Sequence, residues 1–178
     1  MLMVGQRCVA FVLVLTGNFA EALAHYDQAI ALYDPVEHRL LATRFANDLR
    51  SLALWFLGYP GAGLASTEQA LNEARETGHA ASLMPVMDLA CDCQLISANY
   101  ATTKALSDEL IALAEEKDAI YWKTQGLLKR ASLLASTGNA SDAVSIFTST
   151  LPACRSMGTT IRLPWHLCHL ARDRKSVV

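Results

Sequence analysis

The sequence lacks an excess of charge of either sign and a long hydrophobic run. Fifteen Lys and Arg residues stand against 17 Asp and Glu in 178 residues, so the net charge is −2. No basic surplus exists to hold a phosphate backbone, which argues against a dedicated nucleic-acid-binding protein. The longest uninterrupted apolar stretch, residues 8–15, has eight residues, whereas a membrane-spanning helix needs about 20. We therefore expect a protein that binds neither nucleic acid nor membrane.

Paired-cysteine motifs are missing as well. The five cysteines are an odd number with no framework spacing, which predicts reduced thiols and a cytoplasmic protein. Cys91 and Cys93 are two residues apart, so on a helix their side chains point to different sides and are expected to pack in the core. Near the N-terminus, one Arg before an apolar stretch and a small residue at Ala20 leave a signal peptide open as an alternative.

The sequence contains an internal repeat. Four turn segments occur at residues 16–23, 57–64, 97–104 and 136–144, and aligning Gly17, Gly58, Ala98 and Gly138 gives steps of 41, 40 and 40 residues. Gly and Asn tolerate a left-handed backbone, and three of the four turns place Asn directly after the aligned residue. Such turns end one helix and allow the next to begin.

Apolar residues recur at helical spacing on both sides of each turn. The segments before the turns predict helices at 9–15, 40–57, 84–96 and 120–134, and small residues stand where the two helices of each pair should cross, at Ala22, Gly63, Thr103 and Ala143. The pattern predicts an all-α protein, a right-handed α-solenoid in a single domain over 1–178. Its repeats are expected at about 5–35, 37–77, 80–116 and 119–156, with an unpaired half-repeat at 160–175.

The first repeat resembles a tetratricopeptide repeat. It carries the turn glycine Gly17, the small Ala22, the aromatic Tyr26 and Ala29 at the expected offsets, followed by Pro35. The other repeats keep only part of this pattern, and 40 residues exceeds the usual period of about 34. A HEAT-type repeat therefore remains an alternative.

Longer stretches resemble the C-terminal tetratricopeptide region of bacterial adenylate/guanylate cyclase-like, ATPase-linked regulatory proteins. The resemblance covers about residues 5–165 and is most specific at Trp55–Pro60 and at Ala74–His79. In those proteins cyclase and ATPase domains precede the repeats, but this sequence has no GxxxxGK[ST] phosphate loop and no paired metal-binding aspartates. The resemblance implies a non-enzymatic fragment of a larger signalling protein, and a non-functional truncated fragment remains open.

Candidate catalytic groups are few. His166, Cys168 and His169, with Cys154 upstream, form the only His/Cys cluster, which leaves a small metal-dependent enzyme as an alternative. Asp88 and Asp92 are four residues apart on one helix face, and we expect a solvated pair. The glycine-rich residues 58–63 lack the lysine of a phosphate loop and are expected to form a turn. No catalytic residue, metal or cofactor is predicted.

The first helices of the repeats would line a concave face that binds a protein or peptide. In the repeat register its positions are Arg7, Phe11, Phe45, Asp48, Leu52, Trp55, Asp88, Asp92, Gln125 and Ser132. Aromatic side chains among acids suit a peptide with an apolar anchor and a basic residue. The alternative is that Trp55 and Phe56 only pack between repeats.

The first helix is apolar almost all round. Terminal units of a solenoid normally need a polar outer face, yet residues 4–15 include a single charged residue, Arg7. We therefore expect marginal stability or self-association through exposed ends, or contacts with neighbouring domains of a longer polypeptide.

Overall fold

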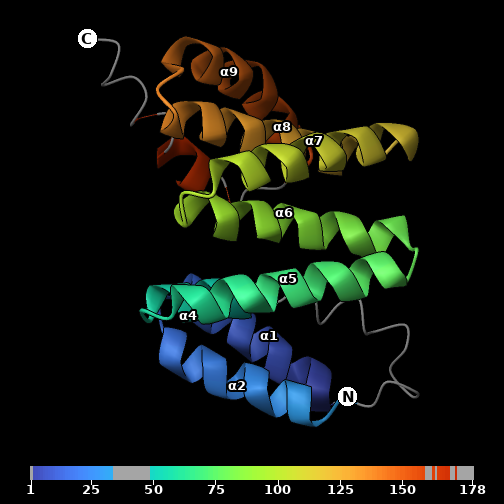
Figure 1. The fold of residues 1–178 in the computed structure, drawn as a ribbon, viewed down its shortest axis with the longest axis vertical. Coiled ribbons are helices and arrows are strands. Elements are labelled where there is room, and N and C mark those ends of the chain that lie inside the picture. Colours follow the sequence, from blue (N-terminus) through green and yellow to red (C-terminus); the bar gives the residue numbers. More distant parts are fainter. Residues whose placement is uncertain (1, 34–48, 159–161, 163, 169–170, 172–178) are drawn as a thin grey trace. The chain divides into compact units, whose positions relative to one another are not determined.

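The computed structural model describes residues 2–33, 49–158, 162, 164–168 and 171, and all secondary structure in these ranges is helical (Figure 1). The chain divides into two compact units, residues 1–93 and 94–178, which are described separately below. The predicted all-α class is therefore confirmed. Within the described ranges, no helix has the length and apolar character needed to cross a membrane.

The first unit consists of successive packed helices. These are α1 (Leu2–Leu15), α2 (Phe19–Ala31), α4 (Arg50–Phe56), α5 (Pro60–Glu76) and α6 (Ala80–Ile96), which continues into the second unit. Helix α2 packs against both α1 and α4, and α4 packs against α5. A buried cluster joins the first three of these helices, and its members are Ala10, Val14, Ala22, Tyr26 and Ala53.

The second unit contains α7 (Tyr100–Glu116), α8 (Ile120–Ser136) and α9 (Ala140–Ser156), followed by a helical turn at 164–168. Helix α8 packs against α7 and α9. The core between α8 and α9 consists of Leu128, Ala131, Phe147, Leu151 and Cys154. Ala143, Phe147 and Leu151, which recur at helical spacing along α9, are all buried.

The four aligned turn residues all have a left-handed backbone. Their φ angles are +84° at Gly17, +90° at Gly58, +58° at Ala98 and +87° at Gly138. In each turn the amide of the following residue donates to a carbonyl five residues earlier, as in the bond from Asn139 N to Leu134 O (2.9 Å). This bond is typical of a Schellman helix end. The predicted positions of these turns are confirmed.

A shorter period, missed in the sequence, lies within the 40-residue step. Gly78, Asp118 and Gly158 also have positive φ, so from Gly58 to Gly158 a left-handed residue recurs every 20 residues. Helices α5 to α9 accordingly have 17 residues each. Helices α5 to α9 thus follow one another as units of equal length joined by three-residue turns.

The small residues predicted at the helix crossings, Ala22, Gly63, Thr103 and Ala143, are buried. Gly63 shows the reason most clearly, because a Cβ atom there would lie 2.6 Å from the carbonyl oxygen of Ser51. The backbones of α4 and α5 therefore approach more closely at this point than any side chain would allow.

Three sequence expectations about helix ends were wrong. The helix predicted at 9–15 begins at Leu2. The turn predicted at 58–63 ends at Tyr59, because Pro60 begins α5; proline suits the first position of a helix, where its missing N–H has no partner to lose. Helix α6 begins at Ala80 rather than at 84. Pro35 and residues 40–48 of the helix predicted at 40–57 lie outside the described residues.

Candidate functional site: an exposed aromatic cluster

The residues predicted for a concave binding face differ widely in exposure. Asp88, Asp92, Gln125 and Ser132 are at most 3% exposed. Arg7, Leu52 and Trp55 are half-buried, and Phe11 is exposed. Phe45 and Asp48 lie outside the described residues. Among the described members of the predicted set, those accessible to a partner are Arg7, Phe11, Leu52 and Trp55, all in the first unit.

The expectation that Asp88 and Asp92 form a solvated pair was wrong. Both carboxylates are buried, as are all residues from Val86 to Cys93. Burial of a charged carboxylate is costly unless the group is paired, and neither residue is without a partner. The residues beside them, Met87, Leu89 and Ala90, are apolar. These apolar neighbours were the feature of the sequence that indicated burial of the two aspartates.

Three aromatic side chains gather on the surface of the first unit. The rings of Phe19 and Phe56 stack with centroids 4.8 Å apart and an interplanar angle of 14°. Trp55 meets Phe56 edge-on, with centroids 5.5 Å apart. Phe56 remains 45% exposed, and Phe19 is half-buried. We refer to Phe19, Trp55 and Phe56 as the aromatic cluster.

The turns of the repeat position this cluster. Phe19 is the first residue of α2, two positions after the left-handed Gly17, and Phe56 is the last residue of α4, two positions before the left-handed Gly58. Because α2 packs against α4, the start of one helix lies beside the end of the other. The repeat register places Trp55 on the predicted concave face but neither phenylalanine, although both phenylalanines lie two positions from a turn glycine in the sequence.

Exposed apolar side chains extend along the same turn. Leu57 is 37% exposed and Tyr59, directly before α5, is 62% exposed. Large apolar side chains on the surface of a protein mark sites of interaction when they occur together rather than singly. This turn therefore presents aromatic and aliphatic groups from consecutive positions to solvent.

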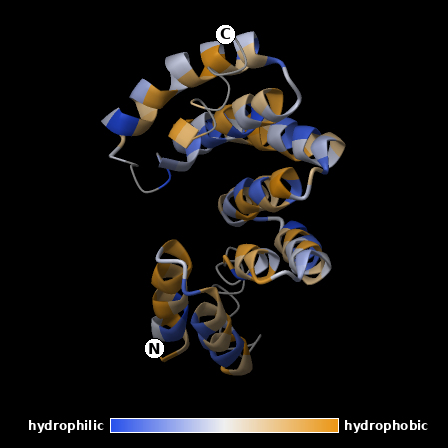
Figure 2. Cartoon of the chain, turned by 90° about the vertical axis from the view of Figure 1, so that its left-hand side faces the viewer, coloured by the Kyte–Doolittle hydropathy of each residue, from blue (hydrophilic) through white to orange (hydrophobic). Residues whose placement is uncertain are grey.

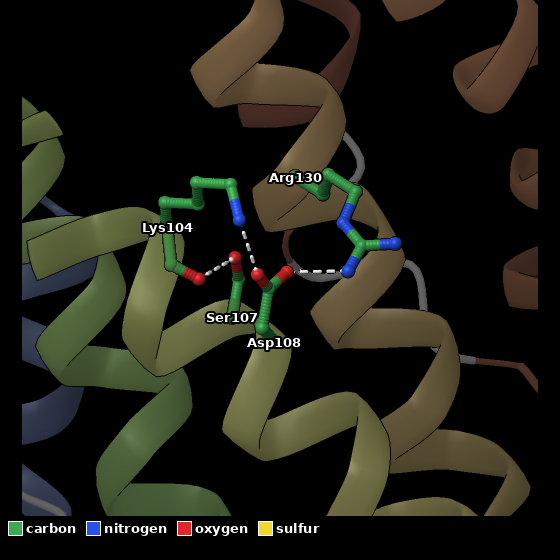
Figure 3. A network of polar contacts seen from close by, with 4 residues as sticks. All are labelled: Lys104, Ser107, Asp108 and Arg130. Atoms are coloured by element: carbon green, nitrogen blue, oxygen red, sulfur yellow. Dashed lines mark hydrogen bonds and ion pairs between the residues drawn. The ribbon is translucent and has the colours of Figure 1, made fainter. Parts of the chain in front are cut away.

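The main polar network described in the second unit consists of two ion pairs that share Asp108 (Figure 3). We call these two ion pairs the Asp108 clamp. Asp108 of α7 accepts from Lys104 Nζ at 2.7 Å and from Arg130 of α8, while Ser107 Oγ donates to the backbone oxygen of Lys104. Partial burial alone would raise the pKa of Asp108, but the hydrogen bonds from Lys104 and Arg130 hold it below its ordinary value. The network joins α7 and α8.

The cysteine prediction is confirmed in the first unit. Cys91 and Cys93 are fully buried, and neither forms a disulfide bond. Burial raises the pKa of the Cys93 thiol, against hydrogen bonds with Thr67 and Ser51 that lower it. A raised pKa keeps the group as a thiol, which is neither a nucleophile nor a metal ligand.

The C-terminal His/Cys cluster gathers no metal-binding group among the described residues. His166 is buried with its ring 6.5 Å from that of Phe147, and Cys168 is exposed. His169, the third member, lies outside the described residues. The described geometry of this cluster is that of a helical turn packed against α9.

No protein-family model matches the sequence, and no curated protein matches it. The resemblances to tetratricopeptide repeats and to cyclase-like regulatory proteins therefore rest on the residues quoted for them.

Proposed function

We infer that this chain is a non-catalytic protein-interaction module, built from helix pairs of the tetratricopeptide type, whose aromatic cluster binds an apolar anchor residue of a partner peptide. The observation that supports this function is the stacked pair of Phe19 and Phe56, which leaves Phe56 nearly half exposed. A ring held in place by a neighbouring ring loses little conformational freedom on binding. Aromatic side chains of this kind dominate the binding energy of many interfaces.

The charge of the first unit specifies a further feature of the partner. Positions 1–93 contain ten acidic and five basic residues, a net charge of −5, whereas positions 94–178 contain seven acidic and ten basic residues, a net charge of +3. An acidic unit attracts a basic ligand and repels an acidic one. The partner is therefore a peptide or protein segment that carries a basic residue near its apolar anchor.

Selection from a random-peptide library tests this function without a known partner. Peptides enriched on the wild-type protein should share an aromatic or large aliphatic residue with Lys or Arg nearby. Their affinity, measured by fluorescence anisotropy, should fall by about tenfold or more for Phe56→Ala, since a central aromatic contact is worth about 2 kcal/mol. Ile120→Ala is the matched control, because Ile120 is 66% exposed in the second unit.

Two results would contradict the proposal. One is the absence of any enriched peptide family under low-salt conditions, where attraction to an acidic unit is strongest. The other is an equal loss of affinity in Phe56→Ala and Ile120→Ala, which would show that the peptides do not contact the aromatic cluster.

A further inference from the structure

One side of α1 is apolar and exposed along the whole helix. Leu2, Val9, Phe11, Val12 and Leu15 are each between 40% and 66% exposed, and they lie on the side away from the buried Met3, Ala10 and Val14. We call these five residues the outer face of α1. Figure 2 shows the apolar character of the helix that starts at the N-terminus.

This face differs from the solvated face of an ordinary helix of the same unit. The exposed side of α5 carries Glu68, Gln69, Asn72, Glu73 and Glu76. In α1 the only charged residue is Arg7, which is half-buried. A surface helix normally presents polar groups opposite its core stripe. The outer face of α1 therefore has the composition of a buried interface.

The packing of the unit shows what kind of element suits this face. Helix α4, the first helix of the second pair, has α2 packed against it, and an ion pair between Arg50 and Asp27 at 3.1 Å joins the two. Helix α1 is the first helix of its own pair and presents its outer face to solvent. Continuation of the same helix-on-helix packing would place another helix on it.

We propose that the outer face of α1 binds the outer face of α1 in a second copy of this chain, in a twofold symmetric dimer. A twofold contact brings each residue near its own equivalent, so a charged face would repel itself. The outer face of α1 carries no charge, whereas the rest of the first unit is acidic. Two copies therefore approach with least repulsion through α1.

The size of the face and the nearby Gly5 agree with a helix–helix contact. With about half of each of five large side chains exposed, the face offers roughly 400 Å² of apolar surface, the scale of the largest patch on a typical monomer. Covering it in both copies, with flanking residues, removes about 1,000 Å² in total, the lower bound for a specific interface. A Cβ at Gly5 would meet nothing within 4 Å, so the second helix has room to approach there.

Sedimentation velocity over a series of protein concentrations tests the dimer. The wild-type protein should shift from monomer to dimer as concentration rises. Val12→Glu should raise the dissociation constant by about tenfold or more, because a charge buried without a partner is costly. Ile30→Glu is the control: Ile30 is 49% exposed on α2 of the same unit, and its variant adds the same charge but should dimerise like the wild type.

Thiol cross-linking then tests the geometry. Cys8 and Cys168 are exposed and the other three cysteines are buried. Because Cys8 lies on α1 beside the outer face, a short bis-maleimide should link two copies through Cys8. The cross-link should disappear in Cys8→Ser and persist in Cys168→Ser.

Three results would overturn the proposal: a monomer at every concentration, equal weakening by Val12→Glu and Ile30→Glu, or a cross-link that depends on Cys168 alone. Peptide binding by the aromatic cluster is measured separately and would survive any of them.

Discussion

Gly63 of α5 lies so close to Ser51 of α4 that a Cβ atom on the glycine would stand 2.6 Å from the serine carbonyl oxygen. The contact is with backbone, which cannot rotate away as a flexible side chain would. This single relationship fixes how closely the two helices of the second pair pack. It also provides a sharp test of the packing at one of the four predicted helix crossings.

Gly63→Ala should destabilise the protein. The new methyl group forces α4 and α5 apart, and overpacking of this kind costs about 1–3 kcal/mol, more than the helix propensity gained from alanine, up to about 1 kcal/mol. Chemical denaturation should therefore show a lower free energy of unfolding.

The control for this substitution is Gly61→Ala in the same helix. A Cβ atom at Gly61 meets nothing within 4 Å, so only the propensity gain remains. The free energy of unfolding of Gly61→Ala should be unchanged or raised. A stable Gly63→Ala variant with wild-type unfolding would show that the two helices are not in close contact.

Substitution by glycine should have opposite effects on the melting temperature at Ala98 and at Ala101. Ala98 has a φ of +58°, and an L-residue there is strained by about 1 kcal/mol or more. Ala98→Gly should raise the melting temperature, whereas Ala101→Gly, in the first turn of α7, should lower it because glycine weakens a helix. The same direction of change for both variants would argue against a left-handed backbone at position 98.

Gly138→Ala tests the equivalent turn of the next pair. Its φ of +87° disfavours any residue with a Cβ, so the variant should lose about 1 kcal/mol of stability. Thermal unfolding followed by circular dichroism gives the measurement. An unchanged melting temperature would contradict the turn geometry.

The Asp108 clamp predicts a pH-dependent contribution to stability. Because the pKa of Asp108 is lowered in the folded state, its ion pairs contribute fully above the ordinary carboxyl pKa of about 4 and are lost as the pH falls below it. Asp108→Asn should therefore lower the free energy of unfolding at pH 7 by about 0.2–1 kcal/mol, the range for exposed ion pairs. The difference from the wild type should shrink toward zero near pH 2.

The dependence on ionic strength provides a second test of the Asp108 ion pairs. The pairs with Lys104 and Arg130 are partly exposed, so the effect of Asp108→Asn at pH 7 should decrease at high ionic strength. A difference that stays constant over both pH and salt would assign the effect to packing rather than to charge.

The repeat was the part of the fold that sequence reasoning predicted best. Gly17, Gly58 and Gly138 share one residue type and, with Ala98, recur in steps of 41, 40 and 40 residues. Each of these turns has the left-handed backbone that glycine favours. Of the intermediate turn residues Gly78, Asp118 and Gly158, the middle one is not glycine, and none is followed by the Asn that marks three of the four aligned turns, so the 20-residue period was not apparent. The left-handed backbone recurs at these turns although the residue type changes.

The accessibility of individual side chains was predicted less well. Asp88 and Asp92 have the spacing of a surface pair but are buried, because their helix is apolar on its remaining sides. Phe56, for which packing between repeats was the alternative, does stack on Phe19 of the preceding repeat, yet it remains nearly half exposed. Which side of a helix meets a neighbour depends on how helices distant in sequence pack, and the periodicity of a single helix does not contain that information.

The most direct test of the interaction function is an NMR titration of the wild-type protein with a selected basic, apolar-anchored peptide. Backbone amide shifts should change first and most at Phe19, Trp55 and Phe56, and the change should saturate with peptide concentration. Shift changes confined to residues 94–178, or no saturable change at all, would contradict the account.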